Sequence, residues 1–121
     1  MAGVVHISWY ATVLRQELLA AKVAEVAPLA LRYGATQYAV HRSQEDRYRI
    51  TQMAWFESKN DWYRYWEGPE MMAFRRRNSR QFQIPINYEW YDELVAGALG
   101  PEVGLEPEPG PELQPEPQAA T

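Results

Sequence analysis

The apolar and polar positions of residues 4–13 alternate with a period of two, which predicts a β-strand. Side chains of a strand point alternately to opposite faces of a sheet. The more apolar set should face a layer of helices, and the other set should face away from it. The first set is Val5, Ile7, Trp9, Ala11 and Val13, and the second is Val4, His6, Ser8, Tyr10 and Thr12.

Over residues 14–35 the apolar spacing changes to three and four, which predicts a helix. Pro28 lacks a backbone donor and should kink or divide this helix, and Gly34 suits its C-terminal end. The buried face should consist of Leu19, Val23, Val26, Ala30 and Tyr33.

The remaining pattern predicts a hairpin, a second helical segment and a last strand. The β-rich runs 36–42 and 47–57 flank the polar turn SQED, as in a β-hairpin. Ser58 suits a helix N-cap, and Gly68-Pro69 should end one helix and start another. Residues 85–94 then form the last strand.

This order of elements predicts an α+β fold, a ferredoxin-like βαββαβ sandwich over residues 1–96. Both helical segments should cover one face of a four-stranded antiparallel sheet. A strongly aromatic opposite face should not remain in water, so we expect a second copy of the chain to cover it and form a homodimer. The aromatic residues expected there are Tyr10, Trp55 or Phe56, and Tyr88 with Trp90.

Charge divides the chain into two parts. Of 12 basic and 16 acidic residues, five glutamates and no basic residue lie from Gly97 onward. Residues 1–96 therefore hold 12 basic and 11 (16 minus 5) acidic groups, which gives no reason to expect nucleic acid. The 97–121 segment also holds six of the nine prolines, a composition typical of a disordered tail. It would serve solubility, or dock a partner protein through Leu105 and Leu113.

Several function classes lack their sequence signatures. There is no cysteine, hence no disulfide and no thiolate nucleophile. No run approaches the ~20 apolar residues of a membrane span and no leader is evident, so we expect a soluble cytoplasmic protein. Because phosphate-loop and G-x-S-x-G motifs are missing and His6 and His41 lack a metal-ligand spacing, we expect neither cofactor nor metal.

One stretch, MAWFESKNDWYRYWEGPEMMAFRRR, resembles the antibiotic biosynthesis monooxygenases of the dimeric α+β barrel superfamily. The resemblance extends over residues 3–95 through the order of elements. It implies a homodimer whose sheets close into a barrel, with a cavity in each subunit between the open sheet face and the second helix. Haem degradation is not implied, because the first strand has no Asn and no His follows Trp66. In the cofactor-independent branch, Trp66 and Asn60 match positions that bind a polyphenol.

The candidate catalytic residues are His6, Tyr10 and Trp66. His6 would remove a phenol proton near neutral pH, with Ser8 and Tyr10 one pleat away. Trp66 would stack on a flat substrate and shares a helix face with Trp62. Among Arg75, Arg76 and Arg77 one would point inward and hold an anion, since helix neighbours lie ~100° apart. The candidate binding residues are Ser8, Trp55, Asn60, Trp62 and Arg76.

Each candidate also has a structural interpretation. Trp62 and Trp66 would be core residues, His6 an interface histidine and the arginines a solvated face. Two hypotheses result: a cofactor-independent monooxygenase, that is, an oxidoreductase for an aromatic, polyketide or quinol molecule, or a non-catalytic dimeric module whose 97–121 segment docks a partner. A cavity lined by His6, Tyr10 and Trp66 would favour the enzyme. A barrel filled by Met53, Trp55 and Trp90 would favour the module.

Overall fold

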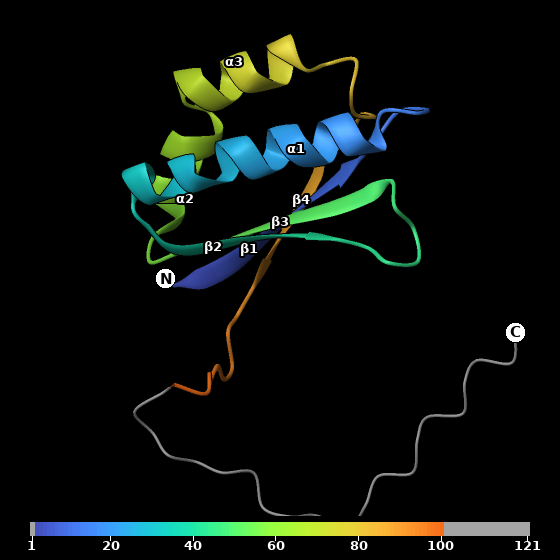
Figure 1. Cartoon of the computed structure of the whole chain (residues 1–121). Helices are drawn as coiled ribbons and strands as arrows, with labels where there is room; N and C mark the ends of the chain where they lie inside the picture. The colour runs from blue at the N-terminus through green and yellow to red at the C-terminus, as the bar shows by residue number, and fades with distance from the viewer. Residues whose placement is uncertain (1, 101–121) are drawn as a thin grey trace, which may run out of the picture.

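The computed structural model describes residues 2–100 and confirms the predicted ferredoxin-like α+β fold (Figure 1). The predicted 97–121 tail lies outside the described residues from position 101. The elements in chain order are β1 (Gly3–Tyr10), α1 (Gln16–Val26), the 3-10 helix η1 (Ala27–Tyr33), β2 (Ala35–Arg42), β3 (Arg49–Phe56), α2 (Lys59–Trp66), α3 (Pro69–Arg77) and β4 (Asn87–Tyr91).

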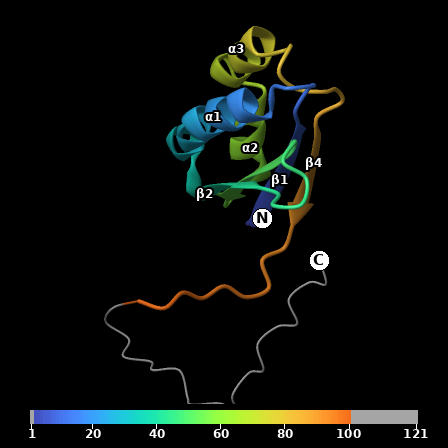
Figure 2. The same cartoon turned by 45° about the vertical axis from the view of Figure 1, so that its right-hand side comes forward.

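The four strands form one antiparallel sheet in the order β2-β3-β1-β4. The helices all lie on one side of it, and the opposite side stays open (Figure 2). In the register of the sheet, His6 of β1 lies between Met53 of β3 and Glu89 of β4. No helix among residues 2–100 is long and apolar enough to cross a membrane.

The helix ends lie at the proline and glycine residues that predicted them. α1 ends at Val26, and the chain continues as a 3-10 helix with Pro28 in its first turn. Gly34 ends η1 with φ 102°, a left-handed conformation that favours glycine. The Ser58 side chain accepts a hydrogen bond from the Asn60 backbone N–H at the start of α2, and Gly68-Pro69 separates α2 from α3.

Three predicted strands were too long, and β3 spans Arg49–Phe56 where 47–57 was predicted. The first ends at Tyr10, because the chain turns at Leu14, whose φ is 64°, and begins α1. The last spans only residues 87–91. Tyr91 pairs with Val4, at the start of β1, so the residues after Tyr91 have almost no β1 backbone left to pair with.

The alternation in β1 is confirmed. Val5, Ile7 and Trp9 are fully buried beneath the helices, whereas Ser8 and Tyr10 are exposed on the other side. From the helical layer Leu19, Val23 and Ala30 are fully buried, and Val26 and Tyr33 pack at the edge of the core. The hydrophobic core therefore lies between the helices and one sheet face.

The prediction that Tyr88 and Trp90 lie on the open face is wrong. Tyr88 pairs with Ile7 and Trp90 with Val5, so both side chains face the helices. Of the alternatives in β3, Trp55 lies on the open face and Phe56 is buried in the core. The open face is consequently less aromatic than expected. It carries Val4, His6, Ser8, Tyr10, Gln37, Ala39, His41, Arg49, Thr51, Met53, Trp55, Asn87, Glu89 and Tyr91.

Candidate functional site

The sheet separates the predicted site residues into two groups. His6, Ser8, Tyr10 and Trp55 lie on the open face, whereas Trp62 and Trp66 lie beneath the helices, on the other face. Asn60 and Arg76 are exposed on α2 and α3. The cavity expected between the open face and α2 is not formed within one subunit, because α2 packs on the opposite face. One subunit therefore cannot bring His6, Tyr10 and Trp66 together.

A groove of about 440 Å³ lies across β1, β3 and β4 on the open face. We call it the open-face groove. It contains an imidazole, hydroxyls, an amide and a carboxylate, so that it can both donate and accept hydrogen bonds. Its lining residues are His6, Ser8, Thr51, Asn87, Tyr88, Glu89 and Tyr91.

His6 is the residue of this groove best suited to proton transfer. Its ring packs on Tyr91, with 4.2 Å between ring centroids. Partial burial lowers its pKa below the ordinary 6.5, Glu89 opposes this shift and His41 adds to it. A histidine with a lowered pKa is neutral at pH 7 and can accept a proton there.

Tyr10 is held away from the groove. Its hydroxyl donates a 2.9 Å hydrogen bond to the Asp46 carboxylate in the β2–β3 hairpin. This hydrogen bond is the main cause of the raised pKa of Tyr10. A tyrosine with a raised pKa is harder to ionise, so of the two bases predicted from the sequence His6 is the better placed.

Trp62 and Trp66 belong to a packed aromatic cluster between α2 and the sheet. Their rings stack with centroids 5.2 Å apart and planes inclined by 14°. Tyr88 lies against both, at 5.1 and 6.1 Å, and Trp9 lies 5.9 Å from Trp66. Trp66 is 6% exposed. This is the core-packing arrangement for both tryptophans, and Trp66 does not line the open-face groove.

Of the three consecutive arginines Arg75 is the one that turns inward. Its guanidinium lies 4.0 Å from the centroid of the Trp66 ring, a cation–π contact. Burial lowers the pKa of Arg75, whereas Arg76 and Arg77 are exposed. The sequence contained a signal for this choice: Arg75 follows buried Met71 by four residues, so the two share one helix face. Arg76 follows exposed Met72 by the same spacing.

Three donors of the aromatic cluster lack an acceptor among residues 2–100: Trp62 Nε1, Trp90 Nε1 and an Arg75 terminal nitrogen. Buried donors normally have partners, so water or an acceptor-bearing molecule would be stabilised here. Deeper in the core, Trp9 Nε1 donates to Gln52 Oε1 at 3.0 Å, and Gln52 Nε2 donates to the Tyr65 hydroxyl at 2.8 Å. The apolar pattern of the sequence did not indicate Gln52, the one polar member of the buried set of β3.

The described residues offer no metal centre, because no three His, Asp or Glu side chains within 2–100 come close enough to share an ion. His6 and His41 lie on one face, but no carboxylate completes a ligand set with both. What the open-face groove can do is proton transfer and hydrogen bonding.

No family model and no curated protein matches the sequence. Solved structures match its fold. A protein from Nitrosomonas europaea, provisionally named as an antibiotic biosynthesis monooxygenase, is 13% identical with a TM-score of 0.69, over 80% of this chain and 94% of its own. Another of that provisional name, from Bordetella bronchiseptica, is 21% identical with a TM-score of 0.67, over 78% and 100%. A variant of SnoaB, a cofactor-independent oxygenase from Streptomyces nogalater, is 9% identical with a TM-score of 0.64, over 78% and 95%.

Proposed function

From the fold of the antibiotic biosynthesis monooxygenases, which this chain shares, we propose that it oxidises a flat, electron-rich aromatic molecule with O₂ and without a cofactor. The reaction takes place in the open-face groove. The observation that carries the proposal is His6, a histidine of lowered pKa in a groove of about 440 Å³, beside an aromatic ring.

In this reaction His6 removes the proton of a phenol or of an activated methylene group. The Tyr91 ring provides a surface on which the substrate ring stacks, a contact worth ~0.5–1.5 kcal/mol beyond burial. Ser8, Thr51 and Asn87 provide donors to the oxyanion that forms. The resulting anion supplies the electrons that reduce O₂. For a methylene substrate, one oxygen atom becomes the carbonyl of the product and the other leaves as water.

Glu89 supports the protonated form of His6. The two residues are paired in the β1–β4 register, and the Glu89 charge favours the imidazolium. The Tyr91 hydroxyl donates a 2.8 Å hydrogen bond to Glu89, which fixes the carboxylate beside the groove. The transferred proton would thus rest on a histidine with a carboxylate nearby, which lowers the cost of charge separation.

The groove lies on an open sheet face, so the reaction needs a cover that excludes water. We propose that a second copy of the chain provides it. One part of the face is apolar, with half-buried Met53 and Trp55 around the buried Val4 and beside Tyr91, and the groove with its polar side chains adjoins that part. Packing of the apolar parts of two copies would enclose the polar groove.

The test is oxygen consumption with a panel of hydroquinones and anthrones. His6→Gln should lower kcat about 100-fold, the scale of a lost general base. His41→Gln is the matched control, because His41 lies on the same face but outside the groove. Trp66→Phe should leave kcat nearly unchanged. Equal rates for wild type and His6→Gln would overturn the proposed role of the groove.

One observation favours the alternative, a non-catalytic module. The rings of Trp9, Trp62 and Trp66 pack on one another between the sheet and α2 and are almost fully buried, which is the arrangement of a structural core. Under this alternative no compound of the panel raises oxygen consumption, and removal of residues 97–121 abolishes capture of a partner protein.

A further inference from the structure

The outer side of the helical layer carries a second groove, unrelated to the open-face groove. It lies between η1 and α3 and has a volume of about 610 Å³. We call it the helical groove. Its apolar surface comes from Val26, Pro28, Leu29, Pro69 and Ala73, and its charged residues are Glu25, Arg32, Glu70 and Arg77.

A neighbouring depression of about 430 Å³ between α1 and α3 continues the helical groove. It shares Glu25, Val26 and Arg77 with it and adds Lys22, Phe74 and Asn78. Arg77 therefore stands between two adjoining hollows, with an apolar surface on one side and a lysine on the other. The two together form an elongated site that suits an extended peptide better than a compact molecule.

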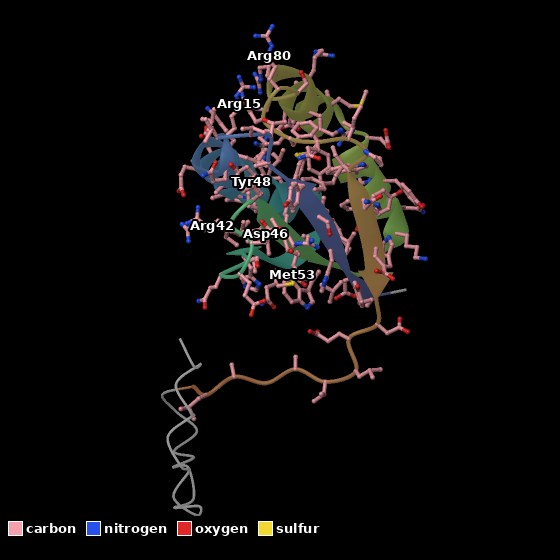
Figure 3. The ribbon with its side chains drawn as sticks, turned by 90° about the vertical axis from the view of Figure 1, so that its right-hand side faces the viewer. Arg15, Arg42, Asp46, Tyr48, Met53 and Arg80 are labelled. Carbon is pink, nitrogen blue, oxygen red and sulfur yellow. The ribbon has the colours of Figure 1, made fainter. Side chains whose placement is uncertain are left out.

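Positive charge exceeds negative charge around the two hollows: their lining includes Lys22, Arg32 and Arg77 against Glu25 and Glu70. Within residues 2–100 no carboxylate lies within ion-pair distance of Lys22 or Arg77. Glu70, by contrast, is engaged, because it accepts a hydrogen bond from the Tyr33 hydroxyl and lies 3.7 Å from Arg32. Arg15 and Arg80 lie together beside α3 (Figure 3), where Arg15 donates a 2.8 Å hydrogen bond to the Arg80 carbonyl, and extend the basic surface.

We propose that residues 101–121 of this chain bind along the helical groove. The segment holds six prolines and five glutamates and no basic residue, so its charge is opposite to that of Lys22 and Arg77. Proline rings in an extended polyproline II conformation pack on apolar grooves at a low entropy cost. Glutamates between them, as in LEPEPGPE, would then face the guanidinium and ammonium groups.

The length of the segment permits this contact within one molecule. Its 21 residues would span about 65 Å in polyproline II, whereas a folded domain of 100 residues has a radius of gyration of about 13 Å. The described chain leaves the sheet after β4 and extends away from it (Figure 1), and the remaining residues are long enough to return to the helical side. Binding there would brace α3 against α1.

The absence of cysteine permits a direct test on the full chain. A nitroxide is attached to a single cysteine introduced by Gln114→Cys, and broadening of backbone amide signals is measured by NMR. We expect selective loss of signal at Lys22, Val26 and Ala73, and unchanged signals in the 43–48 hairpin. High salt should restore the lost signals, because the contact depends on charge.

The double substitution Lys22→Glu with Arg77→Glu should remove the broadening. The control is Arg47→Glu, which makes the same kind of charge change at an exposed hairpin position. Broadening in a mixture of spin-labelled chain and isotope-labelled chain would place the same contact between copies and support the proposal. Uniform broadening, or groove broadening that persists in the double variant or at high salt, would overturn it.

Discussion

Gln52 connects two aromatic side chains in the buried interior. It accepts a hydrogen bond from Trp9 and donates one to Tyr65, and burial raises the pKa of Tyr65 to about 12, so that its hydroxyl keeps its proton. Gln52→Leu would leave the Trp9 N–H without an acceptor. We expect a loss of about 2 kcal/mol in the free energy of unfolding, measured by urea denaturation. Thr51→Val, the adjacent substitution on the open face, should cost less than half as much, and equal losses would contradict this account.

The lowered pKa of His6 should make the stability of the fold depend on pH. The folded chain binds a proton at His6 less readily than the unfolded chain, whose histidine has the ordinary pKa of 6.5. The contribution of this residue to stability is therefore fully present above pH 6.5 and is lost as pH falls from there through the lower pKa of the folded chain. In an NMR titration His6 should show a midpoint below 6.5, and Glu89→Gln should lower it further. A midpoint above 6.5 would refute the desolvation argument.

Some residues of the candidate site could be identified from the sequence and others could not. His6 and Ser8 followed from alternation along one strand, a local pattern. Arg75 could have been chosen over Arg76, because Arg75 follows buried Met71 by four residues and Arg76 follows exposed Met72 by four. The separation of His6 from Trp66 also followed from this alternation, because His6 belongs to the set predicted to face away from the helices. The cavity implied by the family resemblance placed the two together instead.

Among the elements, η1 depends on its terminal glycine. Gly34 has φ 102°, and an added Cβ would approach Asp61 Oδ2 to 2.7 Å. Gly34→Ala combines backbone strain with this clash and should cost about 1–2 kcal/mol, as measured by thermal and urea unfolding. Gly97→Ala, where a Cβ would meet nothing within 4 Å, is the control. Equal stability of the two variants would show that η1 does not need its left-handed end.

Element boundaries were predictable where one residue decides them, as at Pro28, Gly34 and Gly68-Pro69. By contrast, the sequence could not predict which side chains of β4 face the helices. Its side chains alternate Tyr88, Glu89, Trp90 and Tyr91, and both alternating sets contain an aromatic residue. A shift of one residue in pairing exchanges the two faces of a strand. Only the register with β1, a contact far along the chain, therefore decides that Tyr88 and Trp90 face the helices, where Trp90 packs against the core and Tyr88 remains 41% exposed.

At the scale of the whole molecule, the register of β4 with β1 determines which surface a second copy of the chain could cover. The open face carries two fewer aromatic side chains than predicted. It retains an apolar area of Met53 and Trp55 around Val4, next to the polar groove. An interface there would bury Met53, and a carboxylate at that position would lose its hydration. Met53→Glu should therefore convert a dimer into single chains in sedimentation velocity at micromolar concentration.

The control for this experiment is Leu31→Glu, an equal change at an exposed position of η1 on the helical side, which should remain dimeric. The same samples connect assembly to chemistry. If a second copy excludes water from the open-face groove, Met53→Glu should lose oxygen consumption together with the dimer, although His6 is intact. If the folded wild-type chain sediments as a monomer, His6 lies in an open, hydrated groove. Proton transfer from a phenol to His6 would then have no advantage over transfer to bulk water, and the proposed role of the second copy would be wrong.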